Sequence, residues 1–204
     1  MTQPPAIFHL IGKPGVGKYT VGSELARRTG ARLVDNHSIA NVIFNVINPD
    51  GVTPLPEGIW PRVGQVRAAV LDTIVHLSPP GLSFVFTNYM RGDDAAEYAI
   101  FEEFAAIAAL RRSTFVPVIL SCETAELVRR IVRPDRRERL KLIDSIEGAR
   151  LNDRVPQFAP NHPNTLHLDV THTPPQETAQ AIINWRATLH AAQAAQPRIA
   201  NYRP

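Results

Sequence analysis

The sequence predicts an α/β fold, a three-layer sandwich in which a five-stranded parallel sheet is covered by helices on both faces. Five short apolar runs alternate with segments of helical periodicity along the chain. Each run is apolar at nearly every position, as expected of strands that are buried on both faces of a sheet. The 204 residues, 44% of them hydrophobic, suffice for one such core and leave too little chain for a second full domain.

The predicted strands are short and end at turn-forming or polar residues. The first run is followed by Gly12, the second by Asp35-Asn36-His37, and the fourth is closed by Cys122. Runs of this length with such boundaries favour strands over buried helices. The five strands are expected at residues 6–11, 31–34, 82–87, 115–120 and 165–170.

Each predicted helix shows apolar residues at helical spacing, and several have a clear boundary signal. Asn48-Pro49-Asp50-Gly51 and Pro79-Pro80-Gly81 each end one helix. The helix over 95–112 carries acidic residues early and arginines at its end, the order that suits the helix dipole. Pro134 breaks the basic segment, and Pro175 opens the last helix. The helices are expected at residues 16–29, 39–47, 63–77, 95–112, 123–132, 137–150 and 176–189, with a loop up to residue 61.

The composition excludes several classes of protein. The 22 basic and 19 acidic side chains leave a charge of only +3, which argues against binding nucleic acid by bulk charge. No apolar run approaches the ~20 residues that cross a bilayer, and no secretory leader is recognisable, so we expect a cytoplasmic protein without a membrane partner. The single cysteine, Cys122, excludes an internal disulfide. One domain is expected over residues 1–190, followed by a frayed tail at 191–204.

The strongest functional signal is a phosphate-binding loop between the first strand and the first helix. The sequence Gly12-Lys13-Pro14-Gly15-Val16-Gly17-Lys18 has two glycines five positions apart followed by lysine, a pattern that chance would give roughly 0.01 times in this chain. The glycines let backbone amides surround an anion, and the helix N-terminus adds partial positive charge. Nucleotide phosphates are therefore expected to contact Gly12, Pro14, Gly15, Val16, Gly17, Lys18, Tyr19 and Thr20. A structural glycine turn is the alternative.

The residue after the lysine departs from this pattern. A Ser or Thr hydroxyl at that position would reach Mg²⁺, but the chain has Tyr19, whose phenol lies too far from its own backbone. Thr20 is one residue on and rotated by ~100° around the helix. The metal is therefore expected to be held through water by a carboxylate, or to be held less well.

These residues resemble the P-loop kinases of the shikimate, gluconate and nucleoside monophosphate kinase group, within the P-loop NTPase superfamily. The resemblance implies sheet order 2-3-1-4-5, with ATP and Mg²⁺ as cofactors. It places Asp35, after the second strand, opposite the transferred phosphate, where it would serve the metal or the accepting hydroxyl. Thr20 and Asp35 are the metal candidates. Helix capping is the alternative role for Asp35.

The same resemblance suggests the residues of the acceptor side. His37 lies two residues after Asp35, Arg67 lies where the group places a substrate-gripping arginine, and Arg91 follows the third strand. An arginine can fork onto a carboxylate or phosphate, although each of the three can equally be a solvated charge. The segment from Asp35 through Asn41 to Trp60 is faintly similar to the acceptor region of gluconate kinases, a hint of a polyhydroxylated acceptor.

The basic residues are mostly arginines, 19 against 3 lysines, and they are concentrated in one segment. Residues 129–141 contain seven basic and two acidic side chains, so the rest of the chain is slightly acidic. In the kinase group this interval is the lid, here expected over residues 129–150, whose arginines close over ATP. Arg133 and Arg137 are the expected catalytic arginines. A solvated helix face and an RNA-binding patch are the alternatives, the latter disfavoured because no aromatic residue interleaves the run.

The sequence thus predicts an ATP-dependent phosphotransferase that acts on a small-molecule hydroxyl or phosphate. Lys18, Asp35, Arg133 and Arg137 would carry catalysis. One alternative is a nucleotide-binding regulatory or interaction protein with weak or no turnover, which Tyr19 favours. A polynucleotide 5′-hydroxyl kinase is the other. Neither the acceptor nor the oligomeric state follows from the sequence.

Overall fold

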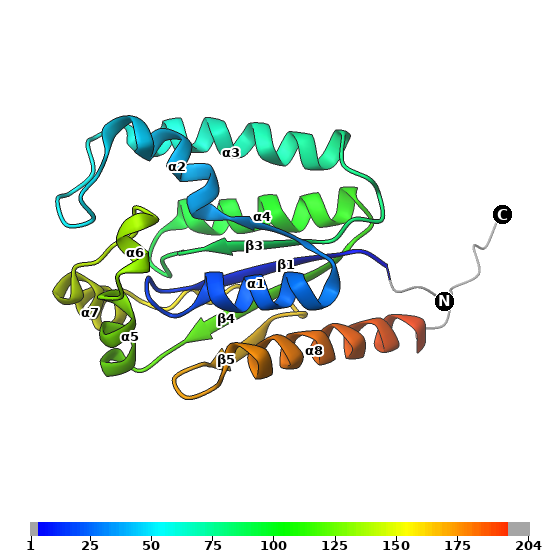
Figure 1. The fold of residues 1–204 in the computed structure, drawn as a ribbon. Coiled ribbons are helices and arrows are strands. Elements are labelled where there is room, and N and C mark those ends of the chain that lie inside the picture. Colours follow the sequence, from blue (N-terminus) through cyan, green and yellow to red (C-terminus); the bar gives the residue numbers. More distant parts are fainter. Residues whose placement is uncertain (1–3, 196–204) are drawn as a thin grey trace.

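A computed structural model describes residues 4–195 of the chain. Its five strands form one parallel sheet in the order β2-β3-β1-β4-β5, which confirms the predicted fold class and strand order (Figure 1). The strands are β1 (Ala6–Gly12), β2 (Arg32–Asp35), β3 (Phe84–Asn88), β4 (Thr114–Ser121) and β5 (Leu166–Asp169).

Helices connect successive strands and follow the last one, as the parallel topology requires. They are α1 (Lys18–Thr29), α2 (Asn36–Ile47), α3 (Ile59–His76), α4 (Ala95–Leu110), α5 (Thr124–Ile131), α6 (Asp135–Glu138), α7 (Ser145–Arg154) and α8 (Pro175–Ala195).

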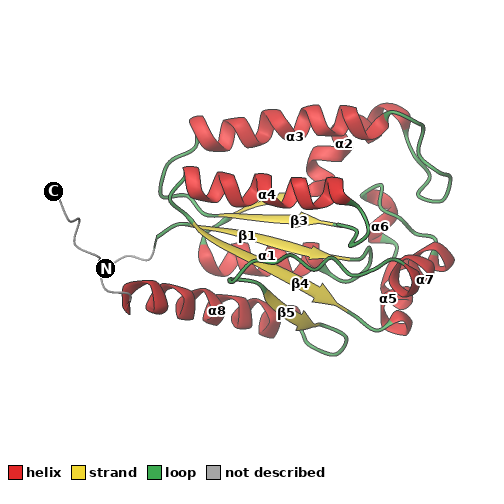
Figure 2. Cartoon of the chain, turned by 180° about the vertical axis from the view of Figure 1, so that it is seen from behind, coloured by secondary structure: helices red, strands yellow, loops and turns green. Residues whose placement is uncertain are grey.

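Alternate residues of the central strand face opposite layers. In β1, Phe8 and Leu10 belong to the core cluster shared with α1 and α8, whereas Ile7 and Ile11 belong to the cluster shared with α3 and α4. Figures 1 and 2 show these two helix pairs on opposite sides of the sheet. A strand buried on both sides is apolar throughout, which explains the unbroken hydrophobic runs in the sequence.

Several predicted boundaries are wrong. The loop expected up to residue 61 ends earlier, because α3 begins at Ile59. Residues 137–150 do not form one helix, because the backbone of Leu140 adopts a left-handed conformation (φ 51) after the short α6, and α7 begins only at Ser145. The side chain of Asp144 caps α7 by accepting from the amides of Ile146 and Glu147. The tail expected from residue 191 begins later, since α8 continues to Ala195, and the rest of it lies outside the described residues.

Cys122 is free and buried after the end of β4, as its sequence position predicts. Among the described residues, no helix combines the length and hydropathy needed to cross a membrane.

One ionisable side chain lies within the core. His9 of β1 is fully buried, with its ring 4.2 Å from the ring of Phe104 and its Nε2 3.0 Å from the Asn88 Oδ1. Burial lowers the pKa of His9 to about 3 from 6.5, although the Asn88 hydrogen bond opposes the shift. The folded protein therefore keeps this imidazole neutral in mildly acidic solution.

We expect His9 to make the fold sensitive to acid. The unfolded chain takes up a proton at His9 below about pH 6.5, and the folded chain does not. The contribution of His9 to the free energy of unfolding is therefore complete above that pH and is lost as the pH falls. The loss approaches ~1.4 kcal/mol of unfolding free energy per pH unit. Urea unfolding between pH 7.5 and 4.5 should show a shallower decline for His9→Gln than for the wild type. Parallel declines would contradict this.

Candidate functional site

The loop between β1 and α1 has the conformation of an anion cradle. Gly15 and Gly17 have φ values of 92 and 107, which other residues rarely adopt. A Cβ on Gly15 would also lie 2.7 Å from Cγ1 of Ile131 in α5. Helix α1 begins at Lys18 with no side chain capping its N-terminus, so its first amides remain available to a ligand.

Lys18 folds back over this loop. Its Nζ donates to the carbonyl oxygens of Gly12 at 2.6 Å and Lys13 at 2.9 Å. Burial lowers the pKa of Lys18 to about 7, and the positive charges of Arg136 and Lys141 act in the same direction. A phosphate in the cradle would replace this repulsion with attraction and raise the pKa again.

This shift predicts that phosphate binding is coupled to proton uptake. Above about pH 7 free Lys18 is neutral, so binding must supply its proton, and affinity should fall by up to about tenfold per pH unit. Calorimetric titration with ATP at pH 8 in two buffers of different ionisation enthalpy should reveal uptake of nearly one proton. Lys18→Arg should reduce that uptake. Uptake close to zero in the wild type would contradict the prediction.

Tyr19 occupies the position of the expected hydroxyl and is covered by two cations from the lid. The Arg139 guanidinium lies 3.9 Å from the centre of the Tyr19 ring, and Lys141 Nζ lies 4.7 Å from it. Both distances are within the range of cation–π attraction. The ring thus holds the lid against the phosphate-binding loop.

Asp35 ends β2 and is buried beside the loop. It occupies the N-cap position of α2, but its side chain makes no capping hydrogen bond, which removes the main support for the capping alternative. Its Oδ1 instead accepts a 2.5 Å hydrogen bond from Thr87, and its Oδ2 lies 3.8 Å from Lys141 Nζ. The carboxylate is therefore close enough for its charge to act on Lys18 and Lys141, although Asp35 is not among the residues that line the basic pocket described below.

The residues present do not fit a protein-held Mg²⁺. The usual hydroxyl is replaced by an aromatic ring that two cations contact, and one oxygen of Asp35 is hydrogen-bonded while the other lies near an ammonium. Thr20 is exposed and forms no side-chain hydrogen bond among the described residues. No group of three or more His, Cys, Asp and Glu side chains in this part of the chain is placed to hold a metal.

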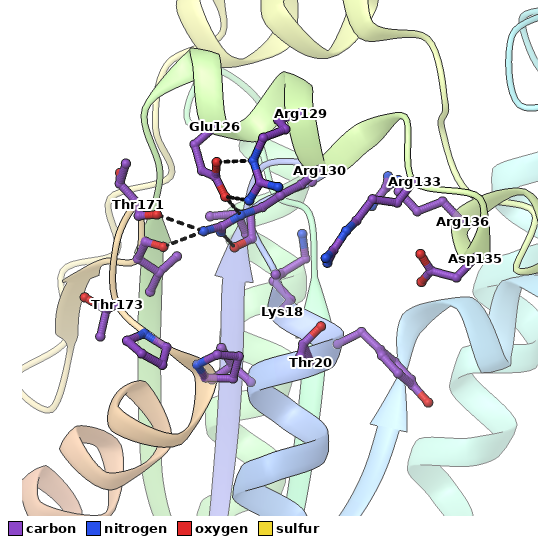
Figure 3. Close-up of a pocket in the computed structure, with 18 of the residues that line it drawn as sticks. Lys18, Thr20, Glu126, Arg129, Arg130, Arg133, Asp135, Arg136, Thr171 and Thr173 are labelled. Atoms are coloured by element: carbon purple, nitrogen blue, oxygen red, sulfur yellow. Dashed lines mark hydrogen bonds and ion pairs between the residues drawn. The ribbon is translucent and has the colours of Figure 1, made fainter.

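A pocket of ≈ 340 Å³ opens over the loop and is strongly basic. Figure 3 shows Lys18 and Thr20 on one side and the lid arginines on the other. The segment between β5 and α8, residues 170–175, completes the lining. Seven basic and two acidic side chains line the pocket: Lys18, Arg129, Arg130, Arg133, Arg136, Arg139, Lys141, Glu126 and Asp135.

Arg130 connects three parts of the site. Its guanidinium donates to the carbonyl of Val16 in the loop and to those of Val170 and Thr171 after β5, and it pairs with Glu126 at 2.7 Å. These bonds use four of its five N–H donors, so Arg130 fixes the positions of α5 and both loops. Sequence reasoning counted it in the basic cluster without assigning it this role.

The two arginines that were expected to be catalytic have different surroundings in the structure. Arg133 lines the pocket, is exposed, and makes no side-chain hydrogen bond among the described residues. Arg137 does not line this pocket and lies only in a second hollow, which Arg133 also lines, together with Pro134 and Ile143. Arg136 lines the pocket instead, with its guanidinium donating to the Leu142 carbonyl.

The lid is attached to the segment that follows β2. The Asn41 side chain of α2 donates to the Arg139 carbonyl at 3.4 Å, and the Ile143 amide donates to the Gly51 carbonyl at 3.2 Å. A Cβ on Gly51 would lie 2.8 Å from the carbonyl oxygen of Lys141, so only glycine permits this approach. These contacts bring the lid, the phosphate-binding loop and Asp35 together.

The three residues that were predicted to bind the acceptor molecule have different surroundings. His37 lies in α2, and burial together with the charge of Lys141 lowers its pKa to about 4, so it is not a solvated loop histidine. Arg67 of α3 faces Glu103 of α4 at 3.7 Å. Arg91 forks onto Asp93 after β3. Neither arginine lines the basic pocket.

Several buried polar atoms outside the basic pocket lack a hydrogen-bond partner among the described residues. They belong to α2, to α3 and to the residues that follow β3. Donors and acceptors that are buried without partners are costly, and a polar ligand would satisfy them. The atoms are His37 Nδ1, Asn41 Oδ1, Arg67 Nε and Tyr89 Oη.

Lys13, within the loop, is a structural residue that sequence reasoning missed. It is 3% exposed, and its Nζ donates to the carbonyl oxygens of Val155 at 2.5 Å and Pro156 at 3.2 Å. Burial lowers the pKa of its ammonium. Lys13 therefore ties the phosphate-binding loop to the end of α7, and no local sequence signal distinguishes it from a solvated lysine.

Solved structures of kinases share this fold. A gluconokinase from Sinorhizobium meliloti covers 96% of this chain and 99% of its own, with a TM-score of 0.63 and 15% identity. A shikimate kinase from Acinetobacter baumannii covers 91% and 94% (TM-score 0.50, 16% identity), and the Mycobacterium tuberculosis APS kinase, in complex with AMPPNP and APS, covers 90% and 98% (TM-score 0.51, 17% identity). No protein-family model and no curated protein matches the sequence. The similarity confirms the expected P-loop fold.

Proposed function

We propose that this protein is a phosphotransferase that moves the γ-phosphoryl group of ATP to a hydroxyl or phosphate group of a small molecule. The observation that carries the proposal is the position of Asp35 and the lid cations beside the phosphate-binding loop. Phosphoryl transfer depends mainly on positioning and on positive charge around the transferred group, and this site supplies both. The shared fold of the APS kinase complexed with AMPPNP, an ATP analogue, supports ATP as the donor.

In this mechanism the chain's residues have distinct roles. The loop amides and Lys18 bind the β- and γ-phosphates, and Arg133 balances charge on the transferred group. Asp35 accepts the proton of the acceptor hydroxyl. The hydroxyl oxygen bonds to the γ-phosphorus, and the bond between the γ-phosphorus and the oxygen that bridges to the β-phosphate breaks. Thr87 holds the carboxylate in place through its hydrogen bond.

The acceptor is proposed to be small and rich in polar groups. The unpartnered buried atoms of His37, Asn41, Arg67 and Tyr89 support this, because such a molecule could bond to them. His37 and Arg67 are the proposed acceptor ligands, and Arg91 would join them by exchanging Asp93 for an anionic group of the acceptor.

The second candidate is a nucleotide-binding regulatory protein with little turnover, which Tyr19 favours because it stands in the sequence where the metal-binding Ser or Thr is usual. A polynucleotide kinase has weaker support, since the basic pocket contains Tyr19 as its one aromatic ring apart from histidine, and that ring is covered by Arg139 and Lys141.

ADP formation separates these candidates. Purified protein is incubated with ATP and a panel of polyols, hydroxy acids and phosphorylated small molecules. The proposed function predicts that ADP forms much faster with one acceptor class than without it. A binding protein without turnover would form ADP equally slowly with every acceptor and without one. A polynucleotide kinase would respond to short oligonucleotides, with an effect that weakens steeply as salt increases.

A further inference from the structure

We propose that Lys141 is a direct ligand of the terminal phosphate and that it replaces the charge of a divalent cation, so that the protein binds nucleoside triphosphates without metal. This inference rests on the proposed function and concerns the same site. It starts from the finding that the residues around Tyr19 and Asp35 do not fit a protein-held Mg²⁺.

Lys141 has the surroundings of an anion ligand. The residue is 8% exposed, yet its Nζ makes no hydrogen bond among the described residues, and the residue lines the basic pocket with Lys18. Its nearest carboxylate oxygen, on Asp35, is 3.8 Å away, which is longer than a charge-assisted hydrogen bond. A buried ammonium with unused donors facing a phosphate-binding loop points to a phosphate oxygen.

Two features fix Lys141 in this position. The left-handed backbone at Leu140 redirects the chain after α6, and the Lys141 amide donates to the carbonyl of Arg136. The Tyr19 ring then lies 4.7 Å from Nζ. Tyr19, which stands where a metal-binding hydroxyl is usual, thus contacts Lys141, the residue that would replace the charge of the metal ion.

The charge around the site is sufficient for this role. The pocket lining has five more positive than negative side chains, and this excess can neutralise a triphosphate without a divalent ion. Lys141 lines the pocket and Asp35, 3.8 Å from its ammonium, does not, so the ammonium can shield a bound phosphate from the carboxylate. Without Lys141 the two anions would repel each other more strongly, and a metal ion between them would then strengthen binding.

The alternative is that Lys141 merely forms a structural ion pair with Asp35. A structural pair would stabilise the lid but would not couple the lysine to metal dependence. The two possibilities therefore differ in how Mg²⁺ changes nucleotide affinity, a quantity that can be measured without turnover.

The test is calorimetric titration of the full chain with ATP and with AMP, each in excess EDTA and in excess Mg²⁺. For the wild type, the two ATP affinities should agree within about threefold. Lys141→Gln should weaken ATP binding in EDTA by between about 10- and 100-fold, with much of the loss recovered in Mg²⁺, and should leave AMP binding unchanged. Arg150→Gln, which removes an exposed lid charge from α7, is the matched control and should behave as the wild type.

Tyr19 provides a second test in which the lysine is intact. Tyr19→Ser removes the ring and restores the hydroxyl, so ATP should bind at least about tenfold more tightly in Mg²⁺ than in EDTA, whereas Tyr19→Phe should remain insensitive to metal. Wild-type ATP binding that requires Mg²⁺, or a Lys141→Gln variant unchanged in EDTA, would overturn this inference and leave the proposed function standing. A wild type that binds no triphosphate in either buffer would overturn both.

Discussion

Lys18→Ala is expected to weaken ATP binding by more than about 100-fold, close to 3 kcal/mol. In the unliganded site the Lys18 ammonium bonds to two carbonyl oxygens of the loop. With ATP it would exchange these for charged phosphate oxygens, and alanine can supply neither contact. The affinity for ATP and ADP should decrease and the affinity for AMP should not, since Lys18 is placed to reach the β- and γ-phosphates.

Arg27→Gln is the matched control for this variant. Arg27 lies in the same helix, is exposed, and pairs with Glu24, so its replacement removes one positive charge away from the pocket. We expect its ATP affinity to stay within about twofold of the wild type. Calorimetry gives both affinities, and thermal unfolding checks that Lys18→Ala is folded. Equal losses in the two variants would mean that general charge, not the loop, binds ATP.

Asp35→Asn is expected to reduce the transfer rate by about 100- to 10,000-fold while ATP binding is retained. Asparagine keeps the shape and can still accept the hydrogen bond from Thr87. It can neither accept the proton of the acceptor hydroxyl nor pair with Lys141. ATP affinity should be equal or higher, because one negative charge near the phosphates is removed.

The control for Asp35→Asn is Asp72→Asn, an equivalent change at an exposed position of α3. In single-turnover experiments with saturating ATP, the control should transfer phosphate at the wild-type rate. If Asp35→Asn transfers phosphate at the wild-type rate, Asp35 is not the proton acceptor, and its pairing with Lys141 would be its main role.

The fold and the phosphate-binding loop could be predicted from the sequence because both depend on local patterns. Apolar runs between helical segments specify buried parallel strands, and Gly15 and Gly17 permit a backbone that other residues rarely adopt. Asp35 was placed by the resemblance to the P-loop kinase group, in which a carboxylate follows the second strand, and it does end β2.

The orientation of the lid residues could not be predicted. The basic segment contains more arginines than the pocket uses, and the turn at Leu140 decides which of them face the loop. That turn is accompanied by distant contacts, from Asn41 to Arg139 and from Gly51 to Ile143. No periodicity within the segment contains this information, so Arg137 was expected in the pocket that Arg136 lines.

Long-range pairing also explains the other differences. Lys13 bonds to carbonyl oxygens more than 140 positions away in the sequence, and Arg67 faces a glutamate of the next helix. Such partners are chosen by packing in three dimensions. Sequence reasoning can name a charged residue, but it cannot tell a ligand-binding side chain from one that another part of the chain neutralises.

The central claim is tested most directly by following the label from γ-labelled ATP. The protein is incubated with the acceptor panel, and the products are separated into acceptor phosphate, inorganic phosphate and unreacted ATP. A phosphotransferase predicts that the label moves into one acceptor class faster than into inorganic phosphate, and that Asp35→Asn abolishes this movement while still binding ATP. Label that stays in bound ATP with every acceptor would contradict the claim and identify a nucleotide-binding protein without turnover.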